Sequence, residues 1–499
     1  MKKTGKLIAC FIVWVFISIG VFAKDYPVSG FGAKNDGRTL NTAIVQGAID
    51  FITANGGGRL VFDSGVYIMG SVYLKSNVTL HLKKGAELRS SGNGLDFVKD
   101  PYIGWMSMIF ALKQDNIGIT GDGMIDGMGF TTALCMLEYA RKGFLVDAMS
   151  YDRAKEDNRP VNIYFRECNN VTITGIKLKD PANWNQVYDQ CKNVYVDSIT
   201  VDCKSYWNND GIDIVDCDGV VIKNSYFDAA DDIICFKSHD ATKICQNVVV
   251  ENCSGRSSAN GIKFGTLSRG GFRNFKITNV TIFDTYRSAI TLQSVDGGIV
   301  ENILIDGVKS YNTGNVIFLR IGDRYKPLND GKASILKDVI IKNVYAEVPL
   351  SKPDSGYSYE GPVEDLPRNI SPSAIVGLPD WRIENVTLSN IEIVYPGGGN
   401  PYYAKRGTSK EELESIPEMP FAYPEFSQFK ELPAWGFYVR HADNITFDNV
   451  ILRAKEADYR PAIVVDDAKD LKLQKMTITE PAAKNKKQTI LNNVTQKKK

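Results

Sequence analysis

Histidine is scarce in this chain of 499 residues, which contains only His81, His239 and His441. A histidine-rich metal site and a Ser/His/Asp catalytic triad both depend on this residue, so neither has much support. We therefore expect no metal and no other cofactor.

An excess of charge of one sign is also absent, because 59 Lys and Arg residues balance 58 Asp and Glu residues. Nucleic-acid-binding proteins usually carry a strongly basic surface, and this balance argues against nucleic acid as a partner. Selectivity must come from a local site.

Beyond the N-terminus, no stretch approaches the roughly 20 apolar residues of a membrane-spanning helix. The N-terminus has three lysines within six residues and then an apolar run over 7–22, which closes on Val21-Phe22-Ala23. These are the parts of a cleavable secretory signal. We expect the mature chain to begin near Lys24 and to be secreted or periplasmic. A lipid anchor at Cys10 fits less well, because most of the apolar segment follows that cysteine.

Cysteine pairs with C-x-x-C spacing are missing. Eight of the nine cysteines would remain in the mature chain, and six of them lie between Cys191 and Cys253. In an exported protein they could form disulfides. We favour the alternative, in which they are thiols packed as small hydrophobic side chains inside the fold.

A repeated strand pattern runs from Asn170 to Ile478. Each copy has a short β-branched run, a polar pair that usually contains Asn, and a second β-branched run. The early copies begin 23 to 28 residues apart, at positions 171, 194, 220, 248, 275 and 299. No copy can bury its own apolar face, so successive copies must stack as coils of parallel strands. The pattern predicts an all-β solenoid, because the motif of leucine-rich repeats, which have a similar period, is absent.

The ends of the mature chain depart from this repeat. Residues 40–54 have helical spacing with Asn41 as a cap, and we expect this helix to cover the first coil. The tail over 483–499 is rich in Lys and Asn, so we expect it to be flexible. The predicted division is a signal peptide over 1–23, one β-helix domain over 24–482 and this basic tail. The largest insertion between coils is Gly397 to Trp435.

Asp210, Asp231 and Asp232 form the most reactive pattern in the sequence. Asp210 and Asp231 are 21 residues apart, close to one coil, so we expect them to stack about 4.8 Å apart. Carboxylates this close raise the pKa of at least one of them, which leaves a protonated carboxyl beside ionised ones. Hydrolysis of a glycosidic bond needs such an acid and base.

Asp231 and Asp232 are neighbours in the chain, and adjacent residues of a strand point to opposite faces. They can share a site only at a strand end, a turn or a bulge. The competing interpretation is that Asn208-Asn209-Asp210-Gly211 and Asp231-Asp232 are merely turn residues, since Asn, Asp and Gly are common in turns.

These motifs resemble those of glycoside hydrolase family 28, the polygalacturonases and their relatives. The family's Asn-Thr-Asp-Gly motif resembles Asn208-Asn209-Asp210-Gly211, with Asp213 following, and its Gly-Asp-Asp motif resembles Ala230-Asp231-Asp232. Further matches are Phe31 to Gly37, Gly121 to Gly127 and the region of Trp184. The resemblance spans essentially the whole mature chain.

The resemblance implies a single-stranded, right-handed parallel β-helix like that of the pectin lyases. It also implies an inverting hydrolysis, in which Asp231 is the general acid while Asp210 and Asp232 activate water.

Two family motifs are altered in this chain. Ala259-Asn260-Gly261 stands where Gly-His-Gly is expected, and Thr291-Leu292-Gln293 stands where Arg-Ile-Lys is expected. In galacturonan-cleaving members, the Arg and Lys grip the sugar carboxylate, whereas Thr and Gln supply no positive charge. Lys263 and Arg287, in matching segments of successive coils, are candidate replacements.

Trp184 and Trp207 could stack on sugar rings, and packing within or between coils explains them equally well. The full set of predicted substrate-binding residues is Asn208, Asp213, Asn260, Lys263, Arg287, Thr291, Gln293 and Trp184.

The predicted function is that of a monomeric glycoside hydrolase. It would cleave α-glycosidic bonds in a pectin-like polysaccharide or oligosaccharide of the galacturonan or rhamnogalacturonan type. One alternative is a polysaccharide lyase, in which a cationic base and often calcium replace the carboxylates. Another is a non-catalytic carbohydrate-binding β-helix, which the altered motifs suggest. Endo and exo action both stay open; the N-terminal cap and the insertion after Pro396, which could close one end of a groove, favour exo action.

Overall fold

The computed structural model describes residues 24–147, 152–325, 331–357, 371–481 and 486–496. The predicted signal peptide lies outside these ranges. Among the helices that the structure describes, none combines the length and the apolar character required to span a bilayer.

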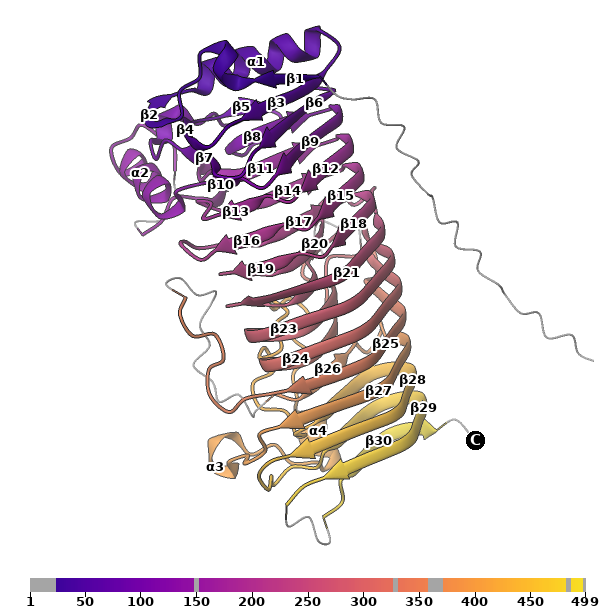
Figure 1. Ribbon diagram of the computed structural model, residues 1–499. Helices are drawn as coiled ribbons and strands as arrows, with labels where there is room; N and C mark the ends of the chain where they lie inside the picture. Colours follow the sequence, from indigo (N-terminus) through magenta and orange to yellow (C-terminus); the bar gives the residue numbers. More distant parts are fainter. Residues whose placement is uncertain (1–23, 148–151, 326–330, 358–370, 482–485, 497–499) are drawn as a thin grey trace, which may run out of the picture.

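The chain winds into the predicted single-stranded, right-handed parallel β-helix, whose coils stack along one long axis (Figure 1). Each strand pairs in parallel with strands of the coils before and after it. The pairing confirms the repeat, because one row of register partners contains Val171, Val194, Val220, Val248 and Phe275.

Three sheets follow from this winding. The first sheet begins with β1 (Asp25–Pro27), β3 (Gly58–Phe62), β6 (Val78–Leu82), β9 (Asp115–Gly121), β12 (Asn169–Thr174), β15 (Lys192–Asp197) and β18 (Asp218–Lys223). The second sheet begins with β2 (Asp36–Leu40), β4 (Gly65–Met69), β7 (Ala86–Ser90), β10 (Met124–Asp126), β13 (Lys177–Lys179), β16 (Thr200–Cys203) and β19 (Tyr226–Ala229).

The third sheet positions the site described below. It contains β5 (Val72–Tyr73), β8 (Ser107–Leu112), β11 (Val161–Arg166), β14 (Gln186–Asp189), β17 (Ile212–Val215), β20 (Ile234–Ser238), β22 (Ile262–Ser268) and, further along, β26 (Ser373–Val376). Later strands are longer, and several bend through more than one sheet: β21 (Cys245–Ser257), β23 (Gly271–Ser294), β24 (Ile299–Ile321), β25 (Ile335–Glu347), β27 (Ile383–Tyr395), β28 (Phe437–Ala454) and β29 (Ile463–Thr479).

The asparagines of the repeat make the bend between the first two sheets. Asn224, Asn252 and Asn279 all have φ between 50° and 54°, a left-handed conformation that Asn tolerates better than most residues. Their side chains also bond from coil to coil: Asn279 donates to Asn252 at 2.7 Å, and Asn252 donates to Asn224 at 3.2 Å. This ladder explains why each repeat carries Asn in its polar pair.

Side chains that point inward form continuous apolar rows. Ile277, Ile305 and Ile341 are register partners in successive coils, and all three are fully buried. The described cysteines are free thiols, of which all except Cys135 are buried. The thiol interpretation of the cysteines is therefore confirmed.

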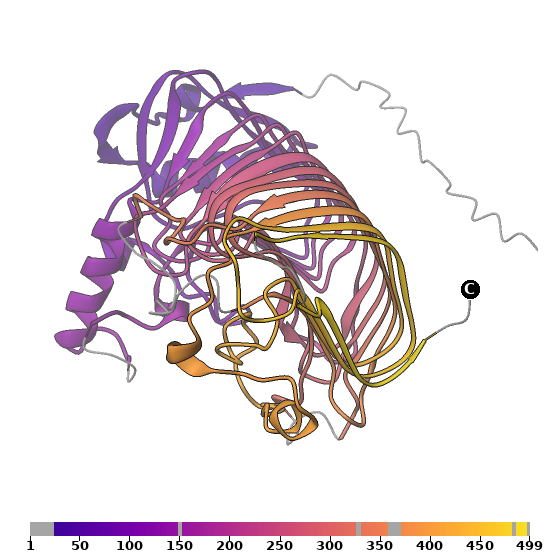
Figure 2. The same ribbon diagram turned by 90° about the horizontal axis from the view of Figure 1, so that it is seen from below.

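Helices occur at the N-terminal end and in insertions. α1 (Thr42–Ala54) covers the first coils, as predicted. Asn41 occupies its N-cap position, although its side chain bonds to Lys34 instead of the helix. The other helices are α2 (Gly129–Arg141), α3 (Pro401–Ala404), α4 (Lys410–Glu414) and the short 3-10 turns η1 (Val28–Phe31), η2 (Gly94–Asp96) and η3 (Glu156–Asn158). Figure 2 looks down the long axis of the β-helix and shows α2 and the segment with α3 and α4 outside the coils.

The C-terminal tail differs from the prediction. Residues 489–496 of the segment expected to be flexible form β30 (Thr489–Gln496), which pairs in parallel with β29. Ile490 and Val494 pack against the apolar clusters of the preceding coils. The prediction relied on the polar composition of the tail and overlooked these two apolar side chains.

Replacing Ile305 with Ala should lower the free energy of unfolding by about 2–5 kcal/mol, because it leaves a cavity in a closely packed row. Lys309, exposed on the same strand, is the control, and Lys309→Ala should change stability by no more than about 0.5 kcal/mol. Urea denaturation followed by circular dichroism measures both. Equal effects of the two substitutions would contradict the assigned inward face.

Candidate active site

Asp210, Asp231 and Asp232 lie where the second sheet turns into the third. Asp210 precedes β17, while Asp231 and Asp232 occupy the turn between β19 and β20. Because Asp231 and Asp232 are outside any strand, their carboxyl groups are not forced to opposite faces. The structure therefore meets the condition under which both can share a site.

The register between coils differs from the prediction. Ile212 of β17 pairs with Ile234 of β20, so the spacing is 22 residues, and the residue beside Asp210 is Asp232. The Gly211 amide accordingly donates to the Asp232 carbonyl at 2.8 Å, and the Asp231 amide donates to the Asn209 carbonyl at 3.1 Å. The expected stacking of Asp231 on Asp210 was thus wrong by one residue.

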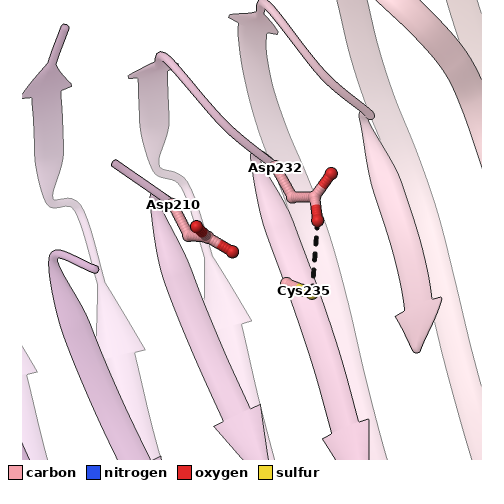
Figure 3. A group of neighbouring side chains, drawn as sticks. All are labelled: Asp210, Asp232 and Cys235. Carbon is pink, nitrogen blue, oxygen red and sulfur yellow. Dashed lines mark hydrogen bonds between the residues drawn. The ribbon is translucent and has the colours of Figure 1, made fainter. Parts of the chain in front are cut away.

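Asp210 and Asp232 lie at the starts of neighbouring strands (Figure 3). One carboxylate oxygen of each, together with the Cys235 sulfur, forms a group whose members are within 4.8 Å of one another. Ligand atoms this close could hold a metal ion. Lysine ammonium groups already bind them, however: Lys237 Nζ lies 3.1 Å from Asp210 Oδ2 and 2.9 Å from Cys235 Sγ, and Lys263 Nζ lies 3.1 Å from Asp232 Oδ2.

Lys237 is the main counter-charge on the Asp210 side. Besides Asp210, its ammonium donates to Asp213 Oδ1 at 2.6 Å. All three side chains are at most 9% exposed, and Asp213 is fully buried. Asp213 therefore fixes the position of the Lys237 ammonium. Its own side chain is not exposed and cannot contact a sugar, contrary to its predicted role as a substrate contact.

Burial raises the pKa of several carboxyl groups in this cluster. Removal from water raises the pKa of Asp231 to about 6, and the negative charge of Asp232 adds to the effect. Burial likewise raises the pKa of Asp213 to about 6, against the pull of Lys237. The pKa of Asp210 also lies well above its usual range, through burial and the proximity of Asp213.

Asp232 behaves in the opposite way. Burial acts to raise its pKa, but the nearby Lys263 and Lys237 ammonium groups and a hydrogen bond from Asn260 outweigh it and lower the pKa below 3.8. The Asn260 backbone and side-chain amides both donate to Asp232 Oδ1, at 3.1 and 2.9 Å. Asp231 thus keeps its proton to a higher pH than the adjacent Asp232 does.

Asn260, which replaces the family histidine, is fully buried. Its side-chain oxygen accepts from the Ser288 amide at 3.2 Å and from Thr291 Oγ1 at 3.3 Å, which fixes the amide so that its nitrogen faces Asp232. Asn260 and Thr291 therefore orient a carboxylate. The prediction that they contact the sugar is not met in this structure, because neither side chain reaches the surface.

Lys263 and Arg287 meet at a residue that sequence reasoning missed. Glu425 Oε1 lies 3.3 Å from Lys263 Nζ and 2.9 Å from Arg287 Nη1, and all three side chains are at most 4% exposed. Gln293, also fully buried, donates to the Pro424 carbonyl of the same segment. Glu425 is 138 residues from Arg287 and lies outside the repeat. The only signal in the sequence was the Glu content of the insertion over 397–435.

Another segment borders the N-terminal side of the carboxylates. Arg159, from the insertion between β10 and β11, donates to Asn208 Oδ1 at 2.7 Å. The Asn208 side-chain oxygen, predicted to contact substrate, thus has a hydrogen-bond partner within the protein. Trp184 is only 8% exposed; it packs on Trp105, and the Lys237 ammonium lies 4.4 Å from its ring centre. The structure thus brings Trp184 to the carboxylate cluster mainly as a packing residue.

A comparison with known families decides what kind of site this is. Residues 64–348 match the family described as Glycosyl hydrolases family 28, a match that includes the three aspartates and covers more than half of the chain. The chain belongs to this family. The protein is accordingly a glycoside hydrolase that acts on O-glycosyl bonds, not a lyase or a non-catalytic sugar binder.

Similar proteins agree with this membership at low identity. An exo-poly-alpha-D-galacturonosidase of Dickeya chrysanthemi is 24% identical over 452 residues, which cover 78% of this chain and 73% of the relative. An endo-polygalacturonase of Pectobacterium parmentieri is 23% identical over 393 residues, which cover 75% and 94%. The solved exopolygalacturonase of Thermotoga maritima shares the fold, with a TM-score of 0.63 at 22% identity over 86% of this chain and 91% of that one.

Replacing Lys237 with Met should destabilise this family 28 hydrolase by about 3–5 kcal/mol at pH 7, because Asp210 and Asp213 lose a buried counter-charge. The deficit should shrink below about pH 5. Asp213 already has a folded pKa near 6, above its unfolded value of 3.8, so its protonated form is favoured by folding and stability falls as pH rises through this interval.

Urea denaturation at pH 5 and pH 7 tests this expectation, with Lys309→Met on the exposed surface as control. A loss of stability that is the same at both pH values would argue against buried carboxylates as its cause.

Proposed function

We propose that this family 28 hydrolase cleaves α-glycosidic bonds in a pectin-like polysaccharide or oligosaccharide, of the galacturonan or rhamnogalacturonan type, with inversion. The observation that carries the proposal is the contrast between adjacent Asp231 and Asp232. The pKa of Asp231 is raised to about 6, and that of Asp232 is lowered. Between these values one carboxyl is protonated beside an ionised one, which is the pair that glycoside hydrolysis requires.

Asp231 is the general acid in this mechanism. It is the least buried of the three aspartates, so its proton can reach the oxygen of the leaving sugar. Asp232 is the base and removes a proton from water, with Asp210 beside it. Their oxygens lie within 4.8 Å of each other, a separation that one water molecule can bridge. Direct attack of this water on the sugar carbon inverts its configuration.

The substrate class is supported by the relatives and by the shape of the site. The similar proteins carry exo- and endo-polygalacturonase names. Arg159 lies on the N-terminal side of the carboxylates, and Glu425 lies on the C-terminal side, where it contacts Lys263 one coil beyond Asp232. Segments that border both sides favour exo action on a chain end over binding in the middle of a long polymer.

Export completes the proposal. A large pectin-like polysaccharide must be hydrolysed outside the cytoplasm because it is too large to enter the cell, in agreement with the signal pattern over 1–23. We propose that the mature protein begins near Lys24 and acts as a secreted or periplasmic monomer.

Asp231→Asn should reduce the release of reducing sugar by about 10²–10⁴-fold, because the amide cannot protonate the leaving oxygen. Galacturonan, rhamnogalacturonan and neutral glycans serve as the substrate panel. The melting temperature should stay near that of the unmodified protein, and Asp122→Asn, on an exposed turn, should keep full activity. Full activity of Asp231→Asn would end the assignment.

Activity should depend on pH through both carboxyl groups. Asp231 must keep its proton, so kcat/KM should fall as pH rises above about 6, whereas Asp232 must be ionised, so activity should persist down to about pH 4. Rates measured from pH 3 to pH 9 on one substrate test this profile. Maximal activity above pH 8 would be incompatible with Asp231 as the acid.

A further inference from the structure

Glu425 occupies the position in which the carboxylate of a sugar would contact Lys263 and Arg287. Its Oε1 atom contacts both Lys263 and Arg287, and it also lies 3.5 Å from the Asn260 side-chain amide. An ion pair with an incoming uronate would require the same ammonium and guanidinium groups. In the described conformation, a carboxylate of the protein itself already neutralises them.

The balance of charge in the whole cluster also disfavours the binding of a further carboxylate. Lys237 is already shared between Asp210 and Asp213, and Lys263 is shared between Asp232 and Glu425. Acidic side chains therefore outnumber basic ones. The acidic residues are Asp210, Asp213, Asp231, Asp232 and Glu425, and the basic residues are Lys237, Lys263 and Arg287. With Asp210 and Asp213 ionised, a further carboxylate would enter a site of excess negative charge even if Asp231 keeps its proton, at a cost that burial makes larger.

The segment that carries Glu425 is fastened to the β-helix. Phe426 and Phe429, which follow Glu425, are buried in an apolar cluster with Phe318, Ala374 and Tyr438 on the outer face of the third sheet. Before Glu425, Gln293 holds the Pro424 carbonyl. Buried contacts on both sides place the Glu425 carboxylate as part of a wall of the site.

Aromatic side chains stand at the rim of the same segment. Phe421 is 61% exposed and Tyr423 is 51% exposed, and the Tyr423 hydroxyl lies 3.4 Å from Lys263 Nζ. Exposed aromatic rings pack well on the apolar faces of sugars, whatever the charge of the sugar. Phe421 and Tyr423 can therefore stack on a sugar ring beside Lys263 and Arg287, whose charges are already paired with Glu425.

From these contacts we propose that Glu425 makes the subsite beside Lys263 and Arg287 selective for a neutral sugar and excludes a uronic acid there. This inference deepens the proposed function and rests on it for the location of the substrate. It leaves uronic acids possible at other subsites, so that a substrate with both neutral and acidic sugars, as in rhamnogalacturonan, fits better than pure galacturonan.

Two probes with the same linkages isolate the carboxyl group: α-1,4-linked trigalacturonate and its carboxyl-reduced form, in which each carboxylate has become a hydroxymethyl group. Binding is measured by calorimetry in an Asp231→Asn background, which prevents turnover. We expect the reduced trisaccharide to bind at least tenfold more tightly than trigalacturonate.

Adding Glu425→Gln to that background keeps the shape of the side chain and removes its charge. The affinity ratio of the two probes should then shift at least tenfold towards trigalacturonate. Glu414→Gln, an exposed glutamate of the same insertion, is the matched control and should leave the ratio unchanged. A ratio that Glu425→Gln does not shift would overturn the inference, because carboxyl reduction changes every sugar of the probe and only the shift reports on the subsite beside Glu425. If Glu425→Gln fails to fold, Glu425→Ala, which also removes the charge, takes its place and is judged by the same shift.

Hydrolysis with Asp231 intact provides a separate readout. If no glycan of the panel is cleaved, the proposed function fails, while the binding ratio still reports on Glu425. Cleavage of pure galacturonan with no effect of Glu425→Gln on binding would leave the hydrolase assignment intact and remove the selectivity inference.

Discussion

Parallel register between coils is the constraint on which this structure depends. Hydrogen bonding fixes each residue of the third sheet beside its counterpart one coil away, so one outward row contains Asp213, Cys235, Lys263 and Thr291 in succession. The same row continues into Phe318, Ala374 and Tyr438. Its first part is the floor of the site, and its second part is the apolar surface on which the insertion packs. One geometric rule therefore builds the chemistry and also positions the segment that covers it.

The buried carboxylates of the site are stabilised by a smaller number of basic side chains, and each lysine contacts two carboxylates. Lys237 faces Asp210 and Asp213, whereas Lys263 faces Asp232 and Glu425. Burial makes every unpaired carboxylate costly, and this cost keeps Asp231 protonated below about pH 6 while Asp232 stays ionised. The division of labour between two adjacent residues thus comes from their partners, since their chemical identity is the same. Asn260 contributes through orientation, because it donates two hydrogen bonds to the ionised member.

Several expectations from the sequence failed for reasons of the same kind. The stacking of Asp231 on Asp210 assumed a coil of 21 residues, but the strand register depends on the backbone between Ile212 and Ile234. Asp213 and Thr291 were taken as sugar contacts because they match or replace family residues, and the fold buries both of them. A tail judged by its polar composition became a strand, because two apolar side chains that pack on the preceding coils suffice to extend an existing sheet edge.

The sequence by itself determined the solenoid, its capping helix, the three aspartates and the family, because all of these are local or periodic patterns. A period in the twenties with a recurring Asn allows hardly any other fold, since each unit must stack to bury its apolar face. Only the tertiary structure decided which carboxylate lies beside which, and what Lys263 and Arg287 bind. Glu425 reaches them from an insertion that no period describes, through packing on an apolar row several coils away, and contacts of that range leave no trace in local sequence.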